Sequence, residues 1–462
     1  MIVFAAGRRT LLCPAALAVI CVSLVLGGCG HGNPAVPGIA PPYYGPVGGP
    51  VGTVGPLSPD IDDTTVGFHA IQIFDDIHGN FITIDEATKN GGRYGAVWGS
   101  RQNTVIPWQT NNPDNRPLLY TPFNTDVPGA MNHPLSWWQT HHPDWILYEC
   151  DKKTIAYVPG LPETPLDFSN PAVAAYQSTL LGDYAELNGY NGIGADIVDL
   201  TNNTGQSRSD KGGCGVWATP ITWKQKFTGS LKDSKWSAAV VSWATALRRL
   251  LHEFPKRLAL AVNTPPGAYT APVNGAGGDP TMRALFDHVD VELDEAGFSI
   301  WGNYVENIPF TNIVGWMEYV QSEGKAFFVA DDWNQQSGEP SKHQVDYSLA
   351  TYMMGKEQAA ALYIGKNEMY GKENYYNQYT AKIGKACSPM YGGPNDKHFL
   401  GEKVYLRKYT GALAIADVSP NTPYKIVLPK PSYTNIEGGK INSPLTVAPN
   451  TGYVLLTAGG CD

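Results

Sequence analysis

The sequence has little charge and no excess of basic residues. Only 16% of its 462 residues are charged, and 33 Lys and Arg against 42 Asp and Glu give a formal net charge of −9. Nucleic acids and anionic membrane surfaces attract proteins with a positive face. We therefore expect no nucleic-acid partner, and no membrane contact through the charge of the folded body.

Several motifs that mark catalytic sites are also missing. The sequence contains no GxSxG, no HExxH and no phosphate-binding loop. No pair of cysteines has the close spacing of a zinc site, and the adjacent His141 and His142 would face apart. We therefore expect neither a metal nor a cofactor.

The N-terminal segment, residues 1–29, has the pattern of an export signal. Arg8 and Arg9 precede an apolar run that is short for a membrane-spanning helix. The LGGC that follows, residues 26–29, resembles a bacterial lipobox, in which cleavage leaves Cys29 as a lipid-modified N-terminus. The alternative is an ordinary secretory signal with a cysteine there by chance. The lipobox predicts a protein of the bacterial cell envelope, lipid-anchored at the outer surface or the periplasmic face.

Four cysteines lie beyond this segment: Cys150, Cys214, Cys387 and Cys461. An even number in an exported chain is compatible with two disulfides, and three connectivities are possible. We favour Cys150–Cys214 and Cys387–Cys461, on sequence proximity alone.

Residues 30–65 begin with a stretch rich in Pro and Gly that has no strict period. Such a composition buries too little apolar surface to fold. We predict a disordered tether, about 100 Å long at most at ~3 Å per residue.

Short apolar runs alternate with amphipathic segments across residues 66–395. The amphipathic segments 169–190, 235–254, 310–324 and 346–358 have helical spacing. The apolar runs read as buried parallel strands, and they predict a (β/α)8 TIM barrel. A ninth strand candidate is 144–149, within the third crossover. The eight runs are 67–74, 94–100, 116–124, 192–199, 257–263, 288–295, 325–332 and 359–365.

Residues 396–462 have a different pattern. They consist of short strand-like runs separated by turn signals, without helical segments. This pattern predicts a small antiparallel β-domain packed on the barrel. We expect the protein to be a monomer.

Carboxylates follow several of the predicted strands. The active site of a TIM barrel lies at the C-terminal ends of its strands, so acids there are candidates for catalysis. Glycoside hydrolysis needs two carboxyl groups, one to protonate the leaving oxygen and one to act as base or nucleophile. Acids follow the first, third, fourth, sixth and seventh strands: Asp75, Asp76, Asp126, Asp196, Asp199, Glu292, Asp294, Glu295, Asp331 and Asp332.

Strand parity orders these acids in part. Asp196 shares a strand face with Gly192 and Gly194, which leave space on that side. It is our first catalytic candidate. On the sixth strand Glu292 falls on the face opposite Glu295, and parity cannot choose between them without a register. We favour Glu295 because it is nearest the strand end.

The alternative for any of these acids is a structural ion pair, for example with Arg257. Trp217 lies in the long segment after the fourth strand, where it could stack on a sugar ring or pin the loop to the body. The residues predicted to bind substrate are Asp199, Glu292, Asp331, Asp75, Asn124, Asn263, Trp98 and Trp217.

Five segments resemble one family. YGAVWGS, NNPDNRPLLYTPFNTD, HHPDWILYECDKKTIAYVPG, LDFSNPAVAAYQ and GYNGIGADIVDL are similar to the glycoside hydrolases called hypothetical glycosidase-like family fifteen, over roughly residues 66–455. The resemblance implies a TIM barrel, often with a C-terminal β-domain, and glycosidase chemistry. It places the two catalytic candidates at Asp196 and Glu295. The sequence departs from the pattern at Asn191, where Asp is usual, and at Val291, where Gly is usual.

The resulting hypothesis is an exported glycoside hydrolase that cleaves an oligo- or polysaccharide with two carboxyl groups at the C-terminal face of the barrel. One alternative is a non-catalytic carbohydrate-binding lipoprotein on the same scaffold, since fold alone does not establish activity. Another is a polysaccharide lyase or transglycosylase that uses the same cleft.

Overall fold

The computed structural model describes residues 73–77, 82–127, 131–273, 275–333, 339–365, 375–393, 400–457 and 460–461. The predicted signal, the lipobox Cys29 and the predicted tether lie outside the described residues. Within the described part of the chain, no helix is both long and apolar enough to cross a membrane.

Eight parallel strands form a barrel, as the sequence predicts. Their order is β1-β2-β3-β5-β8-β9-β10-β11, and a parallel bridge from Ile73 to Leu362 brings the last strand back to the first. The barrel is therefore nearly closed. Its strands are β1 (Phe74–Asp76), β2 (Ala96–Trp98), β3 (Arg116–Pro122), β5 (Gly192–Asp196), β8 (Ala259–Asn263), β9 (Val291–Asp294), β10 (Ala326–Asp332) and β11 (Ala360–Gly365).

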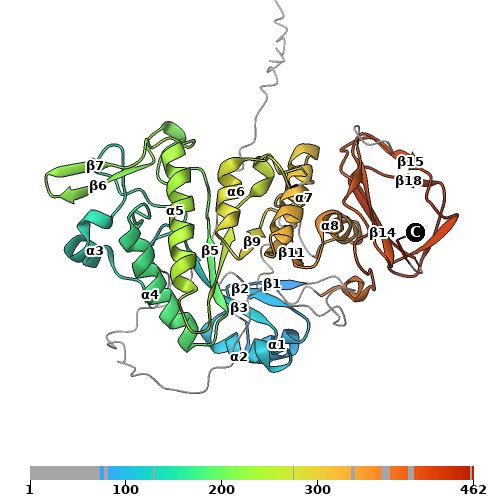
Figure 1. Ribbon diagram of the computed structural model, residues 1–462, viewed down its shortest axis with the longest axis horizontal. Coiled ribbons are helices and arrows are strands. Elements are labelled where there is room, and N and C mark those ends of the chain that lie inside the picture. Colours follow the sequence, from blue (N-terminus) through green and yellow to red (C-terminus); the bar gives the residue numbers. More distant parts are fainter. Residues whose placement is uncertain are drawn as a thin grey trace, which may run out of the picture.

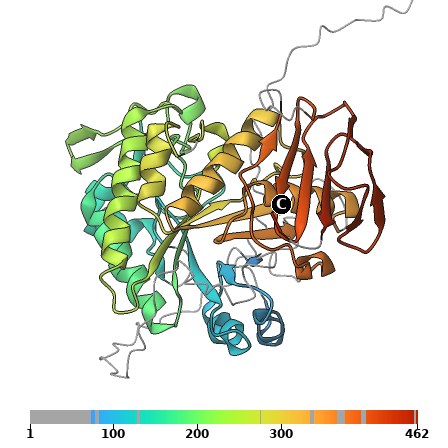
Figure 2. The same ribbon diagram turned by 45° about the vertical axis from the view of Figure 1, so that its right-hand side comes forward.

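Helices cover the outside of the barrel (Figures 1 and 2). The four predicted helices are present as α4 (Pro171–Leu187), α5 (Ser234–Leu251), α7 (Asn307–Ser322) and α8 (Lys342–Gly355). Local signals set their starts: Asn170 caps α4 before Pro171, and Ser341 forms a capping box with Gln344 at α8. Four shorter helices were not predicted: α1 (Ile84–Gly91), α2 (Val105–Thr110), α3 (Leu135–His141) and α6 (Pro280–Asp287).

Alternation along each strand gives the barrel two apolar layers. One set of side chains fills the interior and includes Trp98, Leu118 and Phe328. The other set faces the helices and includes Ile193 and Val262. A residue in the interior layer points into the barrel, and the residues directly before and after it on the strand point outward, toward the helices.

A three-stranded antiparallel sheet projects from the barrel next to α3 (Figure 1). It consists of β4 (Tyr148–Glu149), β6 (Gly213–Thr219) and β7 (Thr222–Gln225). Of the ninth strand predicted at 144–149, only Tyr148–Glu149 forms a strand, which lies outside the barrel, and Pro143–Trp145 forms a 3-10 helix. Trp217 on β6 donates from its indole nitrogen to the Lys152 carbonyl at 3.0 Å and packs on Trp223, with 5.5 Å between ring centroids. These contacts favour the pinning role of Trp217.

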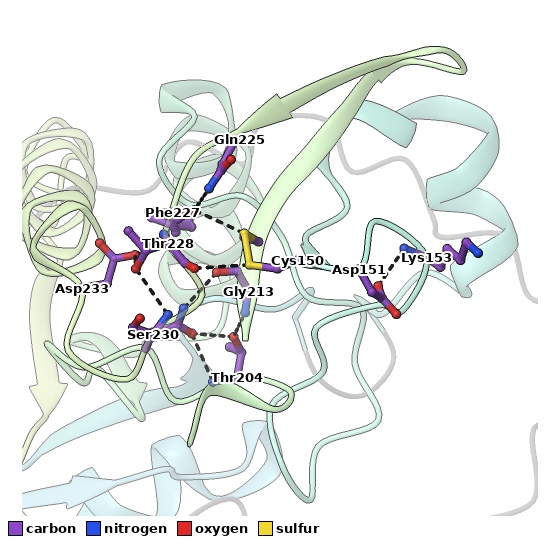
Figure 3. Close-up of a disulfide and its surroundings, with 12 residues drawn as sticks. Cys150, Asp151, Lys153, Thr204, Gly213, Gln225, Phe227, Thr228, Ser230 and Asp233 are labelled. Carbon is purple, nitrogen blue, oxygen red and sulfur yellow. Dashed lines mark hydrogen bonds between the residues drawn. A yellow bond between two sulfur atoms is a disulfide. The ribbon is translucent and has the colours of Figure 1, made fainter. Parts of the chain in front are cut away.

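The Cys150–Cys214 disulfide joins the residue that follows β4 to β6 of the same sheet (Figure 3). The carbonyl oxygens of Thr228 and Phe227 lie 3.3 Å from the two sulfur atoms. Thr228 also donates from its hydroxyl to Asp233 at 2.7 Å, and Asp233 caps the start of α5. The disulfide thus ties the end of β4 to the long segment after β5, beside the loop that precedes α5.

The C-terminal region is the predicted antiparallel β-domain. Its six-stranded sheet has the order β12-β13-β14-β19-β16-β17, and β15 and β18 form a separate pair. Figure 1 shows this region beside α8, against which β14 and β19 pack. Its strands are β12 (Tyr391–Gly392), β13 (Val404–Lys408), β14 (Ala412–Asp417), β15 (Tyr424–Ile426), β16 (Ser432–Asn435), β17 (Lys440–Asn442), β18 (Leu445–Val447) and β19 (Thr451–Leu456).

A second disulfide, Cys387–Cys461, ties the end of this domain to the segment before β12. Both predicted cysteine pairings are therefore confirmed. Disulfides persist in oxidising compartments, so two of them are consistent with an exported protein.

One buried arginine connects the two parts of the molecule. Arg407 on β13 is fully buried and donates to the carbonyls of Met354 and Lys356 at the end of α8, at 2.8 and 3.2 Å. Its guanidinium also donates to the Ser388 carbonyl at 2.9 Å and pairs with Glu357. Arg407 therefore adds a buried polar contact between the β-domain and the C-terminal end of α8 to the packing of β14 and β19.

Candidate active site

The register of the barrel decides which side chains reach its interior at the C-terminal end. Tyr120 lies two residues after the interior Leu118, Asn263 two after Ala261, and Glu295 two after Leu293. Two-residue spacing keeps each of them on the inward face. Asp196 lies beside Pro122 in the register of β3 and β5 and joins the same group.

Three donors surround the Asp196 carboxylate. The Tyr120 hydroxyl donates to Oδ2 at 2.7 Å, and Asn263 Nδ2 donates to Oδ1 at 2.8 Å. The backbone N–H of Ile197 donates to Oδ1 at 2.8 Å. Only 6% of Asp196 is exposed. Hydrogen bonds of this kind stabilise an ionised carboxylate that is removed from water.

The backbone turn after β5 makes one of these bonds. Ile197 has a φ of 57°, in the left-handed region that a β-branched residue rarely adopts. The next residue, Val198, donates from its backbone to the Asn263 carbonyl at 3.0 Å and so ties the turn to β8. Strained backbone of this kind costs on the order of 1–3 kcal/mol and is commonly found at functional sites. Here it folds the Ile197 N–H back onto the Asp196 side chain.

Glu295 shares a donor with Asp196. Asn263 Nδ2 donates to Glu295 Oε2 at 2.6 Å, from the same nitrogen that contacts Asp196 Oδ1. The two carboxylate oxygens are therefore at most about 5.4 Å apart, which is the two bond lengths placed end to end. Glu295 is half-buried in the loop directly after β9.

Gly194 and Trp98 explain the small residues beside Asp196. A Cβ atom on Gly194 would lie 3.3 Å from three atoms of the Trp98 indole, which is fully buried in the barrel interior. The space left by this glycine is therefore filled by a packed ring. Trp98 is part of the apolar interior of the barrel.

Three residues predicted to bind substrate point out of the barrel, toward the helices. Glu292 lies beside Val262 and Phe327, which belong to the layer under the helices. Asp75 and Asp331 each follow an inward residue by one position and so face outward as well. Neighbouring residues on a strand point to opposite faces, so these three side chains point away from the barrel interior. The acids that share the inward face are Asp76 and Asp332.

The outward acids are held in dry surroundings. Asp331 Oδ1 accepts from the backbone N–H groups of Phe298 and Ser299, at 2.6 and 3.2 Å. Burial raises the pKa of Asp331 to about 6 and that of Asp294 to about 7. Burial, together with the charge of Asp294, raises the pKa of Glu292 well above its usual range. Among the described residues, Arg257 forms no ion pair with any of these acids.

Two further predicted ligands have local structural roles. Asp199 is half-buried and accepts from the Thr201 backbone at 2.8 Å, and burial raises its pKa. Asn124 is buried just after β3, where its carbonyl accepts from the Leu166 backbone at 2.9 Å. Neither side chain makes a described hydrogen bond to Asp196 or Glu295.

Tyr120 was missed by the sequence reasoning. Burial, and then the negative charge of Asp196, raises the pKa of its hydroxyl well above the usual range, so the group remains a donor. The signal that could have found it is its place on the same strand face as Leu118, two residues before the strand ends.

Three solved structures share low similarity with this chain. A maltogenic α-amylase from Thermotoga neapolitana has 11% identity and a TM-score of 0.45, with 84% of this chain and 96% of that one covered. An Anoxybacillus α-amylase has 10% identity and a TM-score of 0.44, with 86% of this chain and 99% of that one covered. A GH36 α-galactosidase from Geobacillus stearothermophilus has 10% identity and a TM-score of 0.39, with 84% of this chain and 55% of that one covered.

At these values the similarities bear on neither substrate nor mechanism. No family model matches the sequence, and no curated protein matches it.

Proposed function

We propose that this protein is a glycoside hydrolase that cleaves an oligo- or polysaccharide with Asp196 and Glu295. The observation that supports this proposal is the shared Asn263 nitrogen, which keeps Asp196 Oδ1 and Glu295 Oε2 within about 5.4 Å of each other. Two carboxyl groups at that separation match the arrangement used for glycosidic bond cleavage. The sequence resemblance to hypothetical glycosidase-like family fifteen points to the same chemistry.

The surroundings of the two carboxyl groups suggest their roles. Asp196 has three donors and is the better anion, so it is the nucleophile. Glu295 is more exposed and is the acid and base. Glu295 gives its proton to the glycosidic oxygen while Asp196 attacks C1, and the C1–O bond to the leaving sugar breaks. Glu295 then takes a proton from water, whose oxygen attacks C1 and releases Asp196.

The separation of the pair favours retention at C1. Retaining enzymes hold their carboxyl groups about 5–5.5 Å apart, whereas inverting enzymes need about 6.5–9.5 Å to admit a water molecule. The limit of about 5.4 Å between Asp196 Oδ1 and Glu295 Oε2 agrees with the shorter range.

We predict that the purified protein releases reducing ends from at least one member of a broad glycan panel, with the anomeric configuration retained. Proton NMR of the first products, recorded before mutarotation, measures this configuration. Inverted product would contradict the assigned roles. Glycan binding without release of reducing ends would favour the carbohydrate-binding alternative, and an unsaturated product would favour a lyase.

We also propose that the protein is anchored in the bacterial cell envelope by lipid on Cys29. The LGGC sequence and the two disulfides support export. In a bacterial host fed an alkyne fatty acid, the wild type should become labelled and pellet with membranes. Cys29→Ala should lose the label and appear in the soluble envelope fraction, whereas Cys21→Ala should behave as wild type. Equal labelling of Cys29→Ala and wild type would disprove the anchor.

A further inference from the structure

Asn263 occupies the middle position in the site. It ends β8, which pairs with β5 on one side and with β9 on the other. Asp196 ends β5 and Glu295 follows β9, so the amide lies between the two carboxyl groups. Only 9% of Asn263 is exposed, and its backbone carbonyl is held by Val198. The backbone of Asn263 is therefore tied to the turn that follows β5.

We propose that Asn263 is a positioning residue that holds both carboxyl groups and stabilises whichever of them carries the negative charge. The inference rests on the proposed function. It is based on the two hydrogen bonds from one NH₂ group, at 2.8 Å to Asp196 Oδ1 and 2.6 Å to Glu295 Oε2. An amide nitrogen has two hydrogens, so both bonds form at once.

The charge on the pair moves during the reaction. Before the first step Asp196 is a carboxylate and Glu295 is protonated. Formation of the Asp196–C1 bond neutralises Asp196, and loss of the Glu295 proton to the leaving oxygen makes Glu295 the carboxylate. The second step reverses both changes. A hydrogen bond to an ion is about twice as strong as one to a neutral group, so Asn263 always makes one strong bond.

Tyr120 provides a contrast. Its hydroxyl donates to Asp196 Oδ2 at 2.7 Å. It therefore stabilises Asp196 before the first step and again when Asp196 leaves C1 in the second. Loss of this bond should leave the first step nearly unchanged and slow the second.

The test compares Asn263→Ala with Tyr120→Phe by stopped-flow kinetics on 4-nitrophenyl glycosides that the wild type cleaves. Asn263→Ala should slow both steps by about 10- to 100-fold with KM changed less than about threefold, because each step needs both carboxyl groups held in place at the reacting bond. Tyr120→Phe should slow mainly the second step, so a burst of nitrophenol appears. If the Asn263→Ala substitution slows only one of the two steps, or changes only KM, Asn263 does not position both carboxyl groups.

A second measurement does not depend on turnover. In a crystal structure of Asn263→Ala, the distance between Asp196 Oδ1 and Glu295 Oε2 should exceed the wild-type limit of about 5.4 Å. Unchanged positions would overturn the proposal even if the enzyme is active. If the wild type cleaves no glycan, the proposed function fails, while the structures still decide whether Asn263 positions the pair. Asn312→Ala is the matched control, because Asn312 is a partly buried asparagine on α7 whose side chain donates to the Gly267 carbonyl at 2.9 Å. Both carboxyl groups should keep their positions in this variant.

Discussion

Replacement of Asp196 by Asn is expected to lower kcat on the order of 10⁴-fold, because an amide cannot form the covalent bond to C1. The side chain keeps its size, so the fold should be retained. The release of reducing ends from the glycan that the wild type cleaves best measures the loss, and circular dichroism checks folding. A variant that retains more than about one hundredth of the wild-type kcat would show that Asp196 is not the nucleophile.

Chemical rescue makes this test specific. In Asp196→Gly the carboxylate is replaced by space, and added azide should attack C1 in its place. The expected product is a glycosyl azide of inverted configuration, which NMR identifies. Recovery of activity without the azide product would argue against an attack at this position.

Asp294→Asn is the matched control for Asp196→Asn. Asp294 is the residue just before Glu295, but it faces outward and accepts from the Gly297 backbone at 3.1 Å. Burial raises its pKa to about 7, so a neutral side chain of the same shape suits its surroundings. Activity should stay within about twofold of wild type, as for substitutions that leave the reacting groups in place.

Replacement of Arg407 by Ala is expected to lower the free energy of unfolding by about 3–5 kcal/mol. The guanidinium is fully buried and satisfies the carbonyls of Met354, Lys356 and Ser388, as well as Glu357. Its removal takes this donor from the carbonyls of Met354 and Ser388, while the Lys356 carbonyl keeps the Tyr409 hydroxyl. Arg407→Lys should recover only part of the loss, because a single ammonium cannot reach acceptors arranged around a planar fork.

Guanidinium chloride unfolding measures this effect, and proteolysis between the barrel and the β-domain reports on their docking. The matched control is Arg249→Ala, which removes an exposed pair with Glu253 on α5. Exposed pairs contribute about 0–1 kcal/mol, so this variant should be close to wild type. A loss below about 1 kcal/mol for Arg407→Ala would mean that the barrel and the β-domain do not depend on this contact.

Much of the fold was readable from local sequence. Seven of the eight apolar runs coincide with barrel strands, and the first, 67–74, meets β1 only at Phe74, since residues 67–72 lie outside the described part of the chain. The four longest helical patterns match helices. Buried parallel strands and capped helices leave strong local signals, since both depend on residues close together in the chain. The short helices α2 and α3, with six and seven residues, have too few turns to leave such a pattern.

The candidate site was only partly readable. Parity placed Asp196 on the same strand face as Gly194, and in the structure this face of β5 points into the barrel. Parity could not separate Asp75 from Asp76, or Asp331 from Asp332, because it gives alternation without saying which face is inward. The partners of each strand decide that, and they lie far away in the sequence.

The sequence by itself therefore determined the order and type of the elements, the alternation along each strand and the number of cysteines available for disulfides. Only the tertiary structure decided that Tyr120, Asn263 and Glu295 meet Asp196. Four strand ends up to 175 positions apart come together there because barrel closure and register set the distances between strands. Those distances have no counterpart in local spacing, which is why the shared Asn263 amide could not be predicted.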